Sequence, residues 1–390
     1  MSDIKAVSNS EGSDHDESNG EKLEALHSEM TSNHSALSST AERHDDGEEI
    51  IAAGLEGASV QSAVRINVYE NIPFAGGDGD YSILSILFGA HSIGEGIFGF
   101  LNMRDSNKVR VQCVECRKAV MDFPWMDASH ESRIRGSVRA WRAAFPVARK
   151  VNVSYRDDIV DADFVHIRSD ARVRLHTVHM RNCKRVTDAA FVHLRGIHTL
   201  GMSDCNQTTI TDSAFIHLRG IHTLDMRWCN QATITDSAFI HLRGIHTLYM
   251  GGCNQATITD STFIHLRGIH TLDMSRCNQV TITDSAFIHL RGIHTLYMNY
   301  CNQATITDSA FIHLRGIHTL YMNYCNQATI TDSAFIHLRG IYMLCMRYCN
   351  QATITPAALI HLRGIHTLDT YGCSLAIQSA AAALLAESAS

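Results

Sequence analysis

The chain has 390 residues, of which 45% are hydrophobic, and a formal net charge of −7 at pH 7. This hydrophobic fraction is typical of a globular protein, and the mild acidity argues against general nucleic-acid binding, which usually shows a basic face. No apolar run is long enough to cross a membrane, and the first residues do not form a signal-peptide pattern.

The N-terminal stretch carries no apolar pattern. Residues 1–60 are rich in Ser, Glu, Asp, His and Gly, which predicts a disordered acidic arm. The run Ala-Gly-Gly-Asp-Gly-Asp from Ala75 to Asp80 indicates a linker or turn. It lacks the lysine and the strand–helix context of a phosphate-binding loop, so we expect no nucleotide site there.

Residues 85–126 have apolar residues at helical spacing, which predicts a small helical module. Its pattern is carried by Ile97, Phe98, Leu101, Asp105, Val109, Val111, Cys113, Arg117 and Trp125. This pattern resembles the F-box, a module that docks on the Skp adaptor of cullin–RING ubiquitin ligases. The resemblance implies adaptor contacts through Ile97, Phe98, Leu101, Val109, Cys113 and Trp125. The segment departs from the F-box at Gly89-Ala90, where Leu-Pro is expected, and at Cys116, where tryptophan is expected.

Residues 127–150 are expected to form a linker helix, because Val138, Trp141 and Phe145 are apolar at helical spacing. A repeat region follows, and its clearest unit is Ile221–Gly244, IHTLDMRWCNQATITDSAFIHLRG. The unit recurs every 24 residues without slippage, as its cysteines show at Cys205, Cys229, Cys253, Cys277, Cys301, Cys325, Cys349 and Cys373. A fixed period of this length predicts a solenoid.

Each unit predicts one strand and one short helix. Leu224 and Met226 alternate with polar residues, which indicates a strand with one buried face. In the last unit, Pro356 replaces the aspartate that opens the helix. Proline is tolerated at the first helical position, so we expect Thr235 and its equivalents to be N-caps. Gly244 follows the helix, where a left-handed cap favours glycine.

The repeated pattern resembles the cysteine-containing leucine-rich repeat that is common in F-box proteins. The resemblance implies an α/β fold, namely a right-handed solenoid (horseshoe) with parallel strands on the concave face and short helices on the convex face. It covers residues 151–380. The Ala-rich residues 374–390 are expected to form a closing helix that frays, with 381–390 as a C-terminal tail. The unit is shorter than the usual one of this subtype, and methionine replaces the second strand leucine.

Three columns of the repeat vary while most others stay constant. They are the columns of Asp225, Arg227 and Trp228, which flank the buried Met226. Strand alternation places the first two on the concave side, and such residue types are common in recognition surfaces. Neutral drift of exposed positions is the alternative explanation. The predicted partner-binding residues are Asp225, Arg227, Trp228, Tyr249, Asp273, Arg276, Tyr297, Tyr300, Tyr321, Tyr324, Arg347 and Tyr348.

Cysteine and histidine recur in every unit, but we interpret them as parts of the scaffold. The cysteine row points inward, where a free thiol behaves as a small hydrophobe, and reduced thiols indicate an intracellular protein, cytoplasmic or nuclear. Cys113 and Cys116 have no second pair at zinc-finger spacing. The histidines form two rows, one containing His222 and one containing His241. Protonating such rows would place like charges side by side, so we expect stability to fall as the pH drops through about 6.5.

No catalytic arrangement, cofactor motif or metal-ligand pattern stands out in the sequence. We therefore expect a non-enzymatic protein without a cofactor, whose F-box-like module binds a Skp-type adaptor and whose concave face binds an unknown protein substrate for ubiquitination. The alternative is an interaction scaffold without a role in ubiquitin ligation, in which residues 85–126 only cap the open end of the solenoid. We expect no nucleic-acid partner and no membrane association.

Overall fold

Each repeat contributes one short strand, because a buried leucine lies between two residues that face outward. In the computed structural model, which describes residues 114–123, 125, 133–168 and 175–389, these strands form one sheet. The strands are β1 Lys150–Asn152, β2 Thr177–His179, β3 Thr199–Gly201, β4 Thr223–Asp225, β5 Thr247–Tyr249, β6 Thr271–Asp273, β7 Thr295–Tyr297, β8 Thr319–Tyr321, β9 Met343–Cys345 and β10 Thr367–Asp369. They pair in parallel and in chain order.

The strands pair so that equivalent residues of neighbouring repeats lie side by side. Leu224 of β4 pairs with Leu200 of β3 and with Leu248 of β5. Every leucine in this column therefore lies beside its equivalents, and all of them are buried. This sheet and its helices confirm the predicted α/β leucine-rich-repeat horseshoe.

A short helix follows each strand on the other side of the core. The α-helices of the repeats are α7 Asp161–Phe164, α8 Asp188–Phe191, α9 Asp212–Phe215, α10 Asp236–Phe239, α11 Asp260–Ile264, α12 Asp284–Phe287, α13 Asp308–Phe311 and α14 Asp332–Phe335. Most continue as 3-10 turns, which are η1 Val192–Leu194, η2 Ile216–Leu218, η3 Ile240–Leu242, η4 Ile288–Leu290, η5 Ile312–Leu314 and η6 Ile336–Leu338, while η7 Pro356–Leu362 stands alone.

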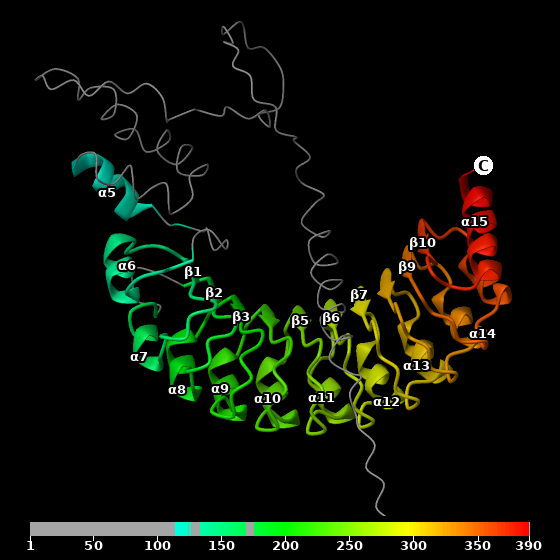
Figure 1. Cartoon of the computed structure of the whole chain (residues 1–390), viewed down its shortest axis with the longest axis horizontal. Helices are drawn as coiled ribbons and strands as arrows, with labels where there is room; N and C mark the ends of the chain where they lie inside the picture. The colour runs from blue at the N-terminus through cyan, green and yellow to red at the C-terminus, as the bar shows by residue number, and fades with distance from the viewer. Residues whose placement is uncertain (1–113, 124, 126–132, 169–174, 390) are drawn as a thin grey trace, which may run out of the picture. The chain divides into compact units, whose positions relative to one another are not determined.

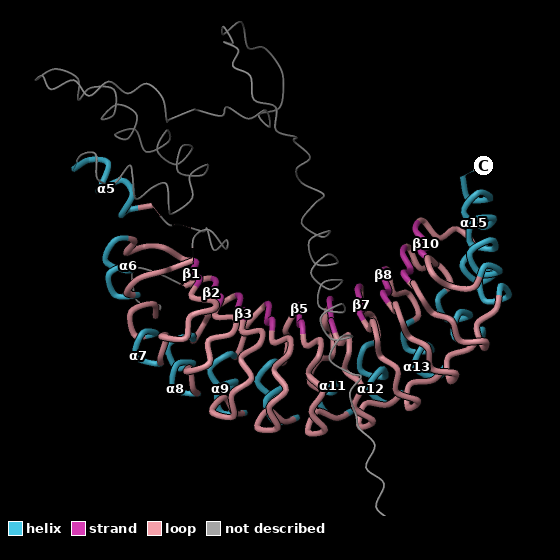
Figure 2. Tube along the Cα trace, viewed as in Figure 1, coloured by secondary structure: helices cyan, strands magenta, loops and turns pink. Residues whose placement is uncertain are grey.

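The repeats curve because their two sides have different spacing. Stacked rings on neighbouring strands lie 4.4 Å apart at Tyr297 and Tyr321, whereas rings beneath neighbouring helices lie 6.4 Å apart at Phe215 and Phe239. The strands consequently line the concave side and the helices the convex side (Figure 1, Figure 2).

The core between sheet and helices is built from the same side chains in each repeat. Leu224, Met226, Cys229, Ile234 and Phe239 are all fully buried. Each thiol of the cysteine row donates to the methionine carbonyl of the preceding repeat, as from Cys229 to Met202 at 3.3 Å. The cysteines are therefore packing residues, as the sequence indicated, and each thiol also has a hydrogen-bond acceptor.

An aspartate–threonine ladder joins the starts of successive helices. The Thr235 side chain caps α10 by accepting from Ser237 N, which confirms it as the N-cap. Its backbone N–H and its hydroxyl both donate to Asp212 of the previous repeat, at 2.7 Å each. The same pair of bonds recurs down to Asp332 and Thr355. Pro356 then replaces the aspartate in the one unit that no further repeat follows.

Helices cover both ends of the repeat stack. At the C-terminal end, α15 Leu375–Ala389 buries Ile377, Ala381 and Leu384, so one helix runs across the expected boundary at residue 381. At the other end, α5 Val114–Asp122 precedes α6 Val138–Ala144. Within the expected linker helix of 127–150, α6 ends at Ala144 because Pro146 disfavours helical geometry at the residue before it.

The expected acidic arm, the Ala75–Asp80 linker and most of the F-box-like module lie outside the described residues. So do five of the predicted adaptor contacts, Ile97, Phe98, Leu101, Val109 and Cys113. Among the described residues, no helix is long and apolar enough to span a bilayer.

Replacing Asp284 by alanine should lower the free energy of unfolding by about 2–3 kcal/mol, because it leaves the N–H and hydroxyl of Thr307 without their acceptor. Urea titration followed by circular dichroism measures this change. The neighbouring exposed Ser285→Ala serves as the control and should change stability by less than about 0.5 kcal/mol. Equal stability of the two variants would show that the ladder does not hold the repeats together.

Candidate functional site

The concave face presents the two strand columns that the sequence analysis selected. Asp225 and Arg227 are half-buried on this face, while Met226 between them is fully buried. The predicted alternation of this strand is therefore confirmed. These side chains are held by a sheet whose backbone is hydrogen-bonded on both sides, for example Met226 N to Tyr249 O at 2.8 Å.

The third column adopts a backbone geometry that the sequence analysis did not predict. Trp228 has a positive φ of 62°, and Arg276, Tyr300, Tyr324 and Tyr348 share it, at 58–61°. This left-handed conformation usually selects glycine or asparagine. Glycine occupies the column at Gly252 and Gly372, and Asn182 and Asp204 also stand in it, so these residue types were the signal in the sequence.

Rings of this column lean over the repeat that follows. A Cβ atom at Gly252 would lie 2.4 Å from the Trp228 ring, and one at Gly372 would lie 2.4 Å from the Tyr348 ring. Both glycines therefore leave room for the preceding ring, in addition to permitting the turn. At these two positions the glycine of one repeat accommodates the ring of the repeat before it, whereas Tyr300, Tyr324 and Tyr348 stack without such a glycine.

Side chains from successive repeats form a continuous stack, which we name the ring column. It consists of Trp228, Arg276, Tyr300, Tyr324 and Tyr348 of the third column and of Tyr371 from the Arg227 column. The Arg276 guanidinium lies 5.7 Å from the Trp228 ring centre and 4.2 Å from that of Tyr300. Tyr300, Tyr324 and Tyr348 follow at 4.4 and 4.6 Å, in parallel stacks. Tyr371 meets Tyr348 edge-on at 5.5 Å.

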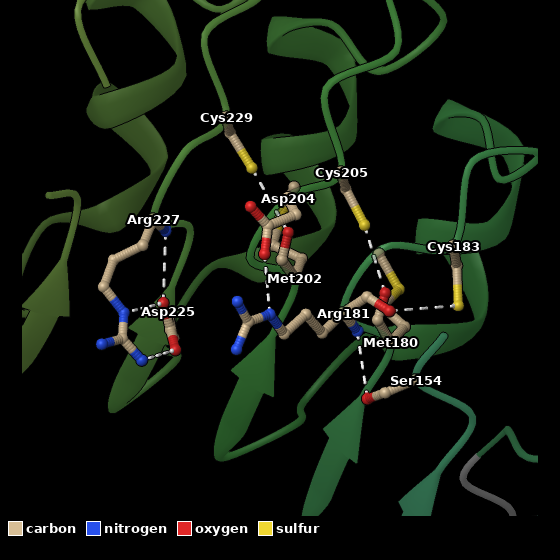
Figure 3. Close-up of polar contacts among 10 residues, drawn as sticks. All are labelled: Ser154, Met180, Arg181, Cys183, Met202, Asp204, Cys205, Asp225, Arg227 and Cys229. Atoms are coloured by element: carbon tan, nitrogen blue, oxygen red, sulfur yellow. Dashed lines mark hydrogen bonds and ion pairs between the residues drawn. The ribbon is translucent and has the colours of Figure 1, made fainter. Parts of the chain in front are cut away.

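Charged pairs occupy the concave face on β2–β6. Arg227 holds Asp225 through two hydrogen bonds of 2.9 and 2.7 Å, and Arg181 holds Asp204 at 2.7 Å. Figure 3 shows both pairs beside the cysteine-to-methionine bonds of the core. Burial would raise the pKa of Asp225, but the hydrogen bonds and charge of Arg227 outweigh it and lower this pKa.

Asp273 behaves differently from Asp225, although both occupy the same column. Burial raises the pKa of Asp273, because only Ser275 hydrogen-bonds to it directly and Arg227 acts at longer range. The guanidinium of Arg227 also lies over the ring of Tyr249 at 5.5 Å. The charged half of the face is therefore a connected network in which most charges are already paired.

Tyrosine dominates the concave face on β7–β9. Tyr297 and Tyr321 stack at 4.4 Å with nearly parallel planes. Burial raises the pKa of both hydroxyls, so they stay protonated donors at neutral pH. Cys345 continues this row, and Arg347 of the neighbouring column pairs with Asp369 at 2.6 Å.

The geometry offers little for catalysis in the described part of the chain. His, Cys, Asp and Glu side chains do not gather there in any group of three or more that could hold a metal ion. Burial raises the pKa of the Cys205 and Cys253 thiols to about 12, so these thiols are not nucleophiles at neutral pH. A shallow pocket of about 230 Å³ lies near β1–β4, between Tyr155, His179, Arg181 and Arg227.

Trp125 is the one predicted adaptor contact within the described residues. Its ring is 1% exposed, it packs edge-on against Phe123 and Phe145, and its N–H donates to Val120 O at 2.8 Å. In this arrangement Trp125 fills the cap of the solenoid instead of offering its ring to a partner.

Histidines form the two expected rows. Rings of the inner row, from His176 to His318, stack at 4.4–4.5 Å. In the outer row, each imidazole accepts a hydrogen bond from an arginine of the previous repeat, as His241 does from Arg219 at 3.2 Å. Burial and this arginine lower the pKa of His241, against a weaker opposing effect of Asp212.

Comparisons with known proteins add little to this description. No family model matches the chain, and no curated protein matches it in sequence. One similar solved chain comes from the TLR13–ssRNA13 complex, with 14% identity and a TM-score of 0.42 over 59% of this chain and 37% of its own length. Another comes from the Toll–Spatzle complex of Drosophila, with 16% identity, a TM-score of 0.44 and coverages of 62% and 37%.

A third similar chain comes from the complex of Rad7 and Elc1 in yeast, with 14% identity, a TM-score of 0.34 and coverages of 61% and 76%. The chain thus spans 37% of the length of the first two structures. At this level of similarity, the fold assignment rests on the sheet and helices described above.

Gly252→Ala should destabilise the protein by at least about 1–2 kcal/mol, because alanine disfavours the left-handed turn and its Cβ would displace the Trp228 ring. Thermal melts measure the loss, and the tryptophan fluorescence should shift to longer wavelength. Gly244→Ala is the matched control, since it also has a positive φ but no neighbour within 4 Å. An identical loss in both variants would mean that the ring does not pack against Gly252.

The protein should lose stability as the pH falls below about 6.5. Burial and arginine neighbours lower the pKa of His217, His241, His265, His289 and His313 in the folded state. Below pH 6.5 the unfolded chain therefore binds more protons than the folded one, so acid favours unfolding. Melting temperatures between about pH 7.5 and 5.5 test this expectation. The double variant His265→Gln and His289→Gln should show a shallower fall, and a flat or rising profile in the natural chain would contradict the assignment.

Proposed function

We propose that this leucine-rich-repeat protein binds a protein partner on its concave face. The observation that carries the proposal is the ring column together with the Tyr297–Tyr321 pair. These side chains are half-exposed, except Tyr371, which is 63% exposed. They pack against one another, and they differ between repeats whose cores are nearly identical. A surface that is both rigid and varied suits recognition of one particular partner.

The stacking of the tyrosine rings determines which of their atoms are accessible to a partner. Because the faces of Tyr300, Tyr324 and Tyr348 cover one another, the ring edges and hydroxyls are what remains for contact. Ring edges and hydroxyls match the mixed apolar and polar surface of another protein. The rings are already ordered, so binding costs little additional side-chain entropy.

The charged pairs of the concave face contribute to the selectivity of binding more than to its affinity. Arg227 and Asp225 neutralise each other, as do Arg347 and Asp369, so a partner gains little net attraction from them. Their fixed geometry disfavours a partner that places a like charge opposite either group. We therefore expect the tyrosine half to supply most of the binding energy.

The finer proposal is that the chain is a substrate receptor of a cullin–RING ubiquitin ligase, with residues 85–126 docking a Skp-type adaptor. The sequence resemblance to the F-box supports it. Trp125, at the end of that segment, packs into the cap of the solenoid with Phe145, which would couple a docked adaptor to the concave face. In this role the chain itself performs no chemistry, and it acts inside the cell, where the buried thiols remain reduced.

An interaction scaffold without a link to ubiquitin remains the second candidate. The packing of Trp125 with Val120 and Phe145 favours it, since residues of the F-box-like segment thereby serve as an end cap. The two candidates share the concave face and differ only in whether residues 85–126 bind an adaptor.

Replacing Tyr297 and Tyr321 together by alanine should weaken binding of the partner by about 30-fold or more, because losing even one central aromatic residue costs about 2 kcal/mol in such interfaces. Affinity capture with the full chain identifies the partner, and titration of the purified pair measures the change. Val280→Ala is the control, since Val280 is 71% exposed on a turn. Unchanged affinity in the tyrosine variant would reject the concave site.

Adaptor docking is tested separately with the full chain and a purified Skp-type adaptor. The natural chain should bind at micromolar concentration, and the variant Leu101→Asp with Val109→Asp should not, because both changes place charge in the predicted apolar contact. Matching melting temperatures of the two chains serve as the folding control. Failure of the folded natural chain to bind would favour the scaffold.

A further inference from the structure

The convex side carries a second periodic surface, which the proposed function does not use. In the repeat of α10 and η3, Ser237, Ile240 and Arg243 are exposed at a spacing of three residues. Residues at this spacing are neighbours on a helical surface. We name the surface formed by these residues and their equivalents the outer ridge.

The outer ridge is an apolar row beside a cationic row. Its isoleucines are 42–56% exposed, namely Ile216, Ile240, Ile264, Ile288, Ile312, Ile336 and Ile360. Its exposed arginines are Arg195, Arg219, Arg243, Arg267, Arg291, Arg315 and Arg339. Together these isoleucines form a continuous apolar row on the surface. Large apolar patches on a protein surface often mark interaction sites.

The arginines of the outer ridge lack a carboxylate partner within the described part of the chain. Each donates to the imidazole of the next repeat instead, as Arg243 does to His265 at 3.2 Å. The lowered pKa of His265 keeps that imidazole neutral, so the guanidinium charge is not compensated. The aspartate of the same repeat, Asp236, is engaged by the hydroxyl and N–H of Thr259.

This arrangement is the opposite of that on the concave face. The ion pairs within the described residues include Arg181–Asp204, Arg227–Asp225 and Arg347–Asp369 and involve no arginine of the outer ridge. The acidity of the chain also lies elsewhere. Residues 1–113 contain 19 acidic and 7 basic residues, whereas residues 114–390 contain 21 acidic and 26 basic residues.

We infer that the outer ridge binds an acidic protein segment that also carries aliphatic side chains. The carboxylates would pair with the arginine row, and the aliphatic groups would cover the isoleucine row. A nucleic-acid backbone would satisfy the arginines but would leave the isoleucines in water. A flat anionic membrane would reach only a few repeats of a convex surface, whereas a peptide can follow the curve.

The spacing of the repeats favours an extended segment. Neighbouring repeats lie 6.4 Å apart at the Phe215 and Phe239 rings. An extended chain rises about 3.3 Å per residue, so every second side chain repeats at about 6.7 Å. The outer ridge lies outside these buried rings, so its repeat spacing is larger than 6.4 Å. With an acidic residue at alternate positions, the long side chains of glutamate and arginine would span the difference.

The test uses the full chain and a fluorescein-labelled peptide of about 20 residues, long enough to span several repeats, with the repeating sequence Glu-Leu-Glu-Ser. Fluorescence anisotropy should show saturable binding that weakens as salt rises, because the charges are exposed. Two control peptides separate the contributions, one with glutamine in place of glutamate and one with serine in place of leucine. Both should bind at least about tenfold more weakly.

Two triple variants test the protein side. Arg243→Ala with Arg267→Ala and Arg291→Ala removes charge, and Ile240→Ser with Ile264→Ser and Ile288→Ser removes apolar surface. Each should weaken binding about tenfold. Lys184→Ala with Arg185→Ala also removes exposed positive charge, away from the outer ridge, and should change affinity less than about twofold. Thermal melts establish that the variants are folded.

Several results would overturn the inference. They are no binding of the acidic peptide at about 1 mM, equal binding by the natural chain and a folded arginine variant, or equal binding of the glutamine peptide. Arginine-dependent binding of a single-stranded oligonucleotide or of phosphatidylserine vesicles, without binding of the peptide, would assign the outer ridge to that ligand instead. Self-association of the full chain that is lost in the arginine variant would assign it to a second copy. All these outcomes are independent of whether the concave face binds a partner.

Discussion

The whole structure depends on one constraint, which is that each repeat must place the same atoms beside the same atoms of the next. Three sets of bonds enforce this register. Parallel backbone pairing aligns the leucines of the sheet, the thiols donate to methionine carbonyls through the core, and the aspartate–threonine ladder ties the helix starts together. Because the bonds involve both the sheet and the helix starts, a slip at one repeat would break contacts on both sides of the core. The buried and ladder residues of the unit recur almost without change, as this requirement demands.

The same register determines what each surface can do. On the concave face it brings equivalent side chains to stacking distance, so that tyrosines cover tyrosines and glycine appears where a neighbouring ring needs room, as at Gly252. Most charges on this face are paired. On the convex face the register lines up guanidinium groups whose only described side-chain partners are imidazoles, such as His265 for Arg243. The concave surface is therefore pre-ordered and nearly neutral, whereas the convex surface is cationic and apolar.

The fold could be predicted from the sequence because the repeat period, strand alternation and helix capping are local patterns. Pro356 alone was enough to locate the N-cap threonines. The left-handed turn at Trp228 was not predicted, since neither Trp nor Tyr is typical of positive φ. Only the Gly, Asn and Asp residues of the same column, such as Gly252 and Asp204, indicated it. The sequence also did not predict the arginine–histidine bonds, which join residues of adjacent repeats and depend on the tilt between them. The burial of Trp125 depends on Phe145, a tertiary contact outside the repeat pattern.

The central claim is that the concave face holds a protein partner, and site-specific photocrosslinking tests it most directly. A photoreactive residue would be introduced into the full chain in place of Tyr249 on the concave face and, separately, in place of Val280 on an exposed turn. The account predicts that the captured partner forms a covalent adduct with the first chain and not with the second. Adducts only at position 280, or equal adducts at both positions, would contradict it.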